Sequence, residues 1–265
     1  MNSIKKLQKI LIVSLALVFT MTACSDDSTS VDDNGDCNIS LPAAFLQAEV
    51  DVSYFNEQDI PNEEEHSVYK QVEQIALSGS SILATGGALE VAAGVLTFAR
   101  SLNIQPDFRD GSCIWEISIP EGFVEGGSPT ITVFATPSSN GVNWEIKATG
   151  VIFGEDVTDQ TIITGFTSSD EQTGEWNLFD PELGATPAIT YTWDIDSENV
   201  YELNFHAEGE VTINYIKNEA ENSMDFDSQQ MMISIHWNTE TDSGWFIDES
   251  GMQCFYEDFV NAGCS

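Results

Sequence analysis

Apolar and polar residues alternate with a period of two over most of the chain after about residue 113. Trp115, Ile117 and Ile119 alternate with Glu116 and Ser118, and the same pattern recurs along the chain. Successive side chains of a strand point to opposite faces, so each run predicts a β-strand with one apolar and one polar face. The predicted strands cover residues 113–119, 130–136, 142–152, 161–168, 174–179, 188–195, 199–207, 210–217, 223–227, 230–238, 244–249 and 252–257.

The connections between these runs are short and rich in Gly, Asn, Asp and Ser, as in Ser139-Asn140-Gly141 and Asp242-Ser243-Gly244. Short links without a helical crossover predict antiparallel neighbours. Because open sheet edges invite aggregation, we expect the meander to close into a barrel or half-barrel packed around the N-terminal helical segment. The predicted fold class is therefore mainly β with that helix inside.

A helical pattern precedes the strands and runs from Asn62 to about Leu102. Asn62 is a suitable cap for a first turn that carries three glutamates. Large residues recur every seven positions from Val68 to Leu96, beside a groove of small residues that includes Gly79 and Gly86. Residues 76–99 contain one charge, but glycines dilute their hydrophobicity, so a helix packed on the sheet is favoured over a membrane span.

The first 23 residues have the features of a bacterial secretion signal. Lys5, Lys6 and Lys9 precede an apolar run, residues 10–20, that is too short to span a bilayer. The sequence Met21-Thr22-Ala23-Cys24 follows and resembles the lipobox of bacterial lipoproteins, although Leu is commoner than Met at its first position. The resemblance implies cleavage before Cys24 and attachment of a diacylglycerol to its thiol. The alternative is an ordinary signal peptide with a chance cysteine.

Residues 24–36 are polar and acidic and predict a disordered tether. The Ser25-Asp26-Asp27 cluster behind Cys24 resembles the surface-export signal of Bacteroidota lipoproteins. That resemblance implies a protein anchored in the outer membrane and facing the exterior, without a transmembrane span. The expected organisation is a signal peptide (1–23), the tether (24–36) and a single helix-plus-antiparallel-β domain (37–265). Its order of elements resembles uncharacterised Bacteroidota surface lipoproteins with a Trp-rich meander, which implies no activity.

Four cysteines remain when Cys24 is set aside, an even number that suits an oxidising compartment. We favour a Cys37–Cys113 clamp and a short Cys254–Cys264 loop among the three pairings. Each would stabilise the fold by a few kcal/mol. A zinc site is the alternative, but no CxxC spacing supports it.

The charge is strongly acidic, with 44 Asp and Glu against 8 Lys and Arg and a formal net charge of −36. Such a surface disfavours nucleic acid and anionic lipid, which need clusters of Lys and Arg. Adaptation to a salty exterior, where self-repulsion is screened, is favoured over a device for binding cations.

Aromatic residues recur on the predicted apolar face. The full inward set is Trp115, Ile117, Trp144, Ile146, Trp176, Leu178, Tyr191, Trp193, Tyr201, Phe205, Ile213, Tyr215, Phe226, Ile233, Ile235, Trp237, Trp245 and Ile247. A core packed against the helix is favoured over a pocket for a hydrophobic ligand or a sugar. If a pocket exists, we expect it to be lined by Trp115, Trp144, Tyr191, Trp193, Tyr201, Phe205 and Trp237.

Catalytic signatures are weak. The chain contains no HExxH, GxSxG or phosphate-binding glycine loop, and His206 and His236 are predicted on polar strand faces. Asp194, Asp196 and Glu198 form the best oxygen cluster for a metal, but they do not complete a calcium loop. No cofactor is predicted.

Three functions fit these patterns. The first is a non-catalytic surface module that binds a lipid, a glycan or a partner protein. The second is a hydrolase that uses two carboxylates, and the third is a passive acidic coat protein. The first is favoured, and the oligomeric state is not predicted.

Overall fold

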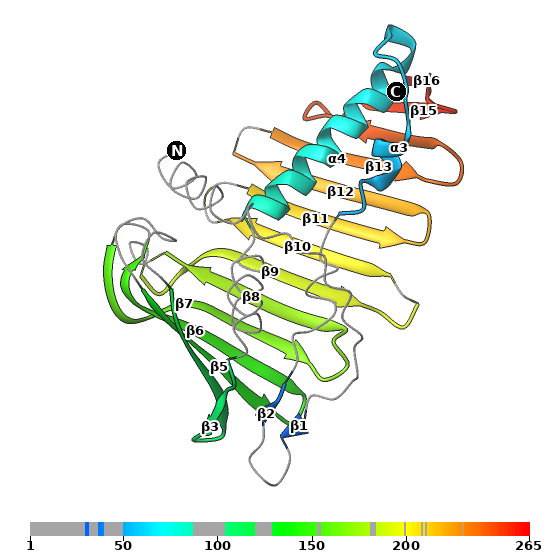
Figure 1. Cartoon of the computed structure of the whole chain (residues 1–265). Helices are drawn as coiled ribbons and strands as arrows, with labels where there is room; N and C mark the ends of the chain where they lie inside the picture. The colour runs from blue at the N-terminus through cyan, green and yellow to red at the C-terminus, as the bar shows by residue number, and fades with distance from the viewer. Residues whose placement is uncertain are drawn as a thin grey trace. The chain divides into compact units, whose positions relative to one another are not determined.

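The computed structural model describes residues 30–31, 37–39, 50–86, 104–119, 129–152, 155–180, 184–198, 200–207, 209, 211–229 and 231–265 (Figure 1). The elements before the large sheet are β1 (Ser30–Val31), β2 (Cys37–Asn38), α3 (Ser53–Glu57), the 3-10 turn η1 (Glu64–His66) and α4 (Ser67–Gly86). The next strands are β3 (Asp107–Arg109), β4 (Ser112–Ser118), β5 (Thr130–Ser138), β6 (Gly141–Ile152), β7 (Glu155–Ser168), β8 (Thr173–Phe179) and β9 (Pro187–Ile195). The last are β10 (Tyr201–Ala207), β11 (Val211–Asn218), β12 (Glu221–Ser228), β13 (Met231–Asn238), β14 (Ser243–Ile247), β15 (Gln253–Glu257) and β16 (Val260–Cys264).

The fold is mainly β, as the alternation predicted. Strands β3 to β16 form one 14-stranded sheet in which each strand pairs with its neighbours in sequence. By Cα proximity the chain divides into two compact units, Met1–Leu46 with Gly87–Thr190 (the first unit) and Gln47–Gly86 with Tyr191–Ser265 (the second unit).

The predicted closure into a barrel around the helix is wrong. Strands β3 and β16 stand at opposite ends of the strand order, and no ladder joins them. Both edge strands are short, which limits the unpaired backbone that they expose. Alternation along each strand is the same in an open and a closed sheet, so it could not decide between them.

Within the first unit, apolar side chains form rows across the strands. One row in register runs from Trp115 through Val133, Ile146 and Ile163 to Leu178, and all five are buried. These rows form the core of the unit because cross-strand neighbours on one face are in contact.

Gly165 of β7 separates two tryptophans in that core. It pairs with Trp144 on one side and Trp176 on the other, and the two indole rings lie 6.0 Å apart. A Cβ at Gly165 would lie 2.5–2.8 Å from three carbons of the Trp176 ring. The glycine therefore provides the space that the Trp176 ring occupies.

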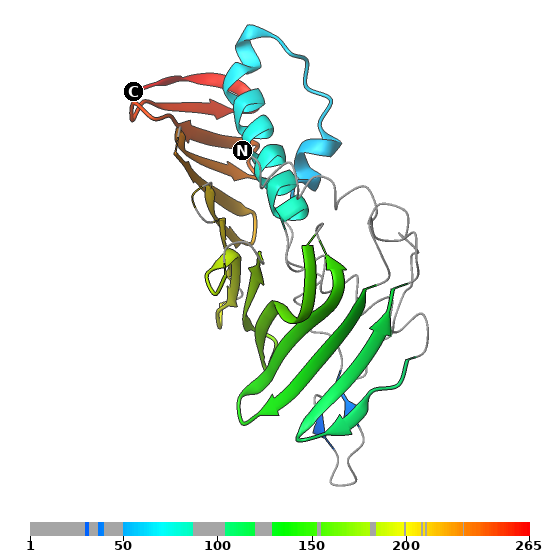
Figure 2. The same ribbon diagram turned by 90° about the vertical axis from the view of Figure 1, so that its left-hand side faces the viewer.

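In the second unit, α4 lies across one face of the last strands (Figure 2). Its buried positions are Val68, Tyr69, Val72, Ala76, Gly79 and Leu83, a helical stripe of mostly small or medium residues. A Cβ at Gly79 would lie 2.9 Å from the Met224 methyl group, so the glycine lets α4 approach β12 closely. Val72 and Gly79, two members of the predicted groove of small residues, thus face the sheet. The continuation of the predicted helix beyond Gly86 lies outside the described residues.

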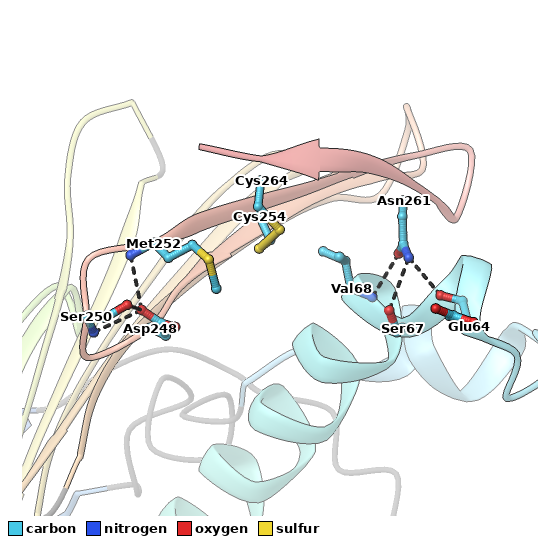
Figure 3. Close-up of a disulfide and its surroundings, with 9 residues drawn as sticks. All are labelled: Glu64, Ser67, Val68, Asp248, Ser250, Met252, Cys254, Asn261 and Cys264. Carbon is cyan, nitrogen blue, oxygen red and sulfur yellow. Dashed lines mark hydrogen bonds between the residues drawn. A yellow bond between two sulfur atoms is a disulfide. The ribbon is translucent and has the colours of Figure 1, made fainter.

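The side chain of Asn261 fixes the edge strand β16 to the start of α4. Its amide nitrogen donates to the Glu64 carbonyl (2.7 Å) and to Ser67 Oγ (3.1 Å), and its oxygen accepts from the Val68 amide (3.0 Å) (Figure 3). The last of these bonds satisfies the Val68 amide, one of the donors at a helix N-terminus that lack intrahelical partners. The contact also covers part of a sheet edge.

Two inward assignments in β14 are wrong. The buried residues of this strand are Gly244 and Phe246, so Trp245 and Ile247 lie on the opposite face and are only partly buried. Gly244 explains the shift, because a Cβ there would lie 2.7 Å from the Tyr256 ring on the buried face. Among the described helices, none combines the length and hydropathy that a membrane crossing requires.

Candidate functional site

The seven residues predicted to line a pocket belong to the core. Trp115 and Trp144 lie in the first unit, and Tyr191, Trp193, Tyr201, Phe205 and Trp237 lie in the second. Six of them are buried, and Tyr201 is partly buried. The structure brings Tyr191 and Trp193 together, with ring centroids 6.4 Å apart.

Trp237 shows how the core of the second unit is filled. Its indole stacks on Tyr215 at 6.0 Å and contacts Phe55 of α3 at 5.4 Å. The Tyr215 hydroxyl donates to Asn222 Oδ1 at 2.7 Å, so this buried polar pair is satisfied. The α3 side chains therefore occupy the space next to Trp237 that a ligand would need.

Three tyrosines gather between the helices and the sheet in the second unit. Tyr69 contacts Tyr256 at 5.5 Å, and the Tyr54 hydroxyl donates to Asp242 Oδ1 at 3.1 Å. Burial raises the pKa of all three hydroxyls, and the Asp242 charge raises the pKa further. They stay protonated at neutral pH, so this cluster is suited to packing and hydrogen-bond donation and not to nucleophilic or base chemistry.

The acidic turn after β9 has a structural role. Asp196 Oδ1 accepts hydrogen bonds from the backbone amides of Glu198 (2.8 Å) and Val200 (2.9 Å). This is the pattern by which an Asp side chain closes a turn. Within the part of the chain that the structure describes, no three His, Cys, Asp or Glu side chains are grouped to hold a metal, so Asp194, Asp196 and Glu198 form no such site.

A shallow surface depression lies near the start of α4. It is lined by Glu63, Glu64, Glu65 and Asn261. The Asn261 side chain is already engaged with the helix start. The depression is therefore an acidic rim of the α4–β16 contact and lacks the convergent apolar walls of a small-molecule site.

The face of β10–β16 opposite α4, called the outer face below, carries a row of side chains in register. The row, here the outer row, consists of Glu202, Ile216, Ser223, His236, Trp245, Phe255 and Gly263 on consecutive strands from β10 to β16.

The His236 and Trp245 rings of this row stack at 5.5 Å with an interplanar angle of 11°. The Glu221 carboxylate holds the histidine, because it pairs with His236 Nε2 and accepts from Asn238 Nδ2. The stack is thus anchored from β12 and β13, and Phe255 stands next to Trp245 on β15.

Acidic groups surround the outer row. Three exposed carboxylates lie on the outer face, because each is an even number of positions from the outer-row residue of its strand. They are Asp225 and Asp227 on β12 and Glu257 on β15. From residue 201 to residue 265 the sequence contains one Lys or Arg, Lys217. Lys217 points to the other face, where its Nζ binds Asp51 Oδ2 at 2.7 Å. The outer face of these strands is therefore aromatic and anionic.

Sequence reasoning placed His236 on a polar face but missed its stacking with Trp245. The pair was not predicted because Trp245 was assigned to the inner face of the sheet. Gly244 was the available signal, because a glycine among large apolar residues marks a position where another group approaches the backbone.

Both favoured disulfide pairings are present in the structure. Cys37 Sγ bonds to Cys113 in the first unit, and Cys254 bonds to Cys264 across β15 and β16 in the second. Residues 30–31, within the predicted tether, pair with Cys37–Asn38 as a two-stranded ladder. Cys24 lies outside the described residues.

In comparisons with known proteins, the chain matches no family model, and no curated protein or solved structure gives a significant match.

Proposed function

We propose that the chain is an exported lipoprotein, anchored through Cys24 in the outer membrane, that faces the exterior and acts as a non-catalytic binding module. The observation that carries the export is the disulfide pattern. All four cysteines other than Cys24 pair with one another. Persistent disulfides require an oxidising compartment, which agrees with a secretion signal before Cys24.

A binding role is supported by the difference between the two faces of the sheet in the second unit. One face of β12–β16 packs against α4, with Phe55 of α3 against Trp237, and no described helix covers the outer face (Figure 2). Partly buried aromatic side chains on such a face are typical of recognition surfaces, because they supply contact area at a small entropic cost.

Acylation at Cys24 is tested by growing cells that express the full chain with an alkyne-bearing palmitate analogue. We expect the wild-type protein to carry the label and to fractionate with the outer membrane. Cys24→Ser removes the thiol that directly follows the leader and should abolish the label, whereas the neighbouring control Ser25→Ala should keep it. Equal labelling of Cys24→Ser and the wild type would refute the anchor.

The orientation is tested on intact cells by added protease. A protein that faces the exterior is cleaved without breaking the cells, while a periplasmic marker protein survives. Protection of the chain until the cells are lysed would contradict the outward orientation and leave acylation unaffected.

A further inference from the structure

The outer row combines three features that a purely structural strand face does not need. It places a stacked His236–Trp245 pair beside Phe255, it leaves these rings only partly buried, and it lies among exposed carboxylates. Met232, on the same face of β13, is 62% exposed, the highest value among the large hydrophobic side chains of the described residues. Apolar groups that remain exposed together commonly mark an interaction site.

The charge of this face limits what can bind it. A second copy of the chain, a nucleic acid or an anionic membrane would bring negative charge against Asp225, Asp227 and Glu257. Like charges across an interface cost several kcal/mol, so these occupants are disfavoured. A positively charged partner is favoured for two reasons. The carboxylates attract it, and the faces of aromatic rings bind cations.

We propose that the outer row binds a basic polypeptide segment, with Arg or Lys side chains over Trp245 and Phe255 and their charges shared with Asp225, Asp227 and Glu257. This inference deepens the proposed binding role and rests on it, but it does not depend on the lipid anchor. Arg suits the site best, since its planar guanidinium stacks on aromatic rings and also pairs with carboxylates. His236 positions Trp245 through the ring stack, and Glu221 fixes His236.

The test uses the purified full chain in neutral detergent and an oligo-arginine peptide as probe, with affinity measured by calorimetry. We expect binding that weakens as salt rises, as the carboxylates require. Trp245→Ala should weaken it about tenfold, the effect of losing a partly desolvated cation–π contact. Trp245→Phe keeps an aromatic face and should recover most of the affinity.

The control is Phe108→Ala in β3, which removes an exposed aromatic side chain (40%) from the first unit. It keeps the net charge of the protein and should leave the affinity unchanged. Equal affinity of the wild type and Trp245→Ala would show that the peptide responds to overall charge alone, and would overturn the proposal.

A second measurement needs no variant. Carbodiimide labels exposed carboxylates, and bound peptide should protect Asp225, Asp227 and Glu257 while Asp159 in the first unit stays reactive. Uniform protection of all carboxylates would overturn the proposal. So would Trp245-dependent binding of a neutral oligosaccharide in the absence of peptide binding, which would identify a glycan-binding surface. None of these outcomes changes the acylation test at Cys24, so the two proposals fail separately.

Discussion

Gly79→Leu tests whether α4 packs directly on the sheet. Gly79 is buried, and an added Cβ would collide with the Met224 thioether of β12. Helix propensity alone favours the change by about 1 kcal/mol, because leucine is a good helix former and glycine a poor one. Overpacking a filled core costs about 1–3 kcal/mol, and four extra carbons at a site without free space belong at the upper end. We therefore expect a net loss of about 2 kcal/mol.

The assay is urea unfolding followed by near-ultraviolet circular dichroism, with hydrogen exchange to locate the change in residues 67–83. Ser78→Leu introduces the same side chain at an exposed neighbouring position and should change stability by less than about 0.5 kcal/mol. In the Gly79→Leu background, Met224→Ala should restore part of the loss, which gives a coupling of about 1 kcal/mol or more. If Gly79→Leu is neutral or stabilising, α4 does not lie on β12 and the reasoning fails.

Three further predictions concern the contacts that hold the second unit together. Asn261→Ala removes three hydrogen bonds to the start of α4 and should cost about 1–3 kcal/mol in urea unfolding, with faster exchange at the first turn of α4. The Lys217 hydrogen bond holds the pKa of Asp51 below its usual value, so its stabilisation is complete above the unfolded pKa and is lost as pH falls through the folded pKa. Because both side chains are partly exposed, Lys217→Met should remove at most about 1 kcal/mol at pH 7, and its deficit should vanish in acid. Replacing Cys254 and Cys264 by alanine opens a loop of 10 residues and should cost about 2–3 kcal/mol, seen as a lower urea midpoint.

The strands were predictable because alternation with a period of two reports burial directly. The twelve predicted runs match β4–β15 to within a few residues, except that β7 begins at Glu155, earlier than predicted. β16 was missed because Val260–Cys264 contains Gly and Ala and lacks alternation. It forms through a tight turn at Asp258 and Phe259, both with positive φ, that returns the chain beside β15.

The arrangement of the sheet and the outer row could not be predicted in the same way. Whether a meander closes depends on whether its first and last strands meet, and local pattern contains no information about that distance. The outer row depends on register between seven separate strands. In β14, Trp245, Phe246 and Ile247 are all large and apolar, so only contact with Tyr256 determines which of them is buried.

Oxidative footprinting of the tryptophans tests the two-faced sheet of the second unit most directly. Hydroxyl radicals modify side chains according to their exposure, and Trp245 and Trp237 lie on opposite faces of neighbouring strands. We predict rapid oxidation of Trp245 and strong protection of Trp237, which is fully buried against Phe55 and Tyr215. Equal modification of the two, or faster modification of Trp237, would contradict the account.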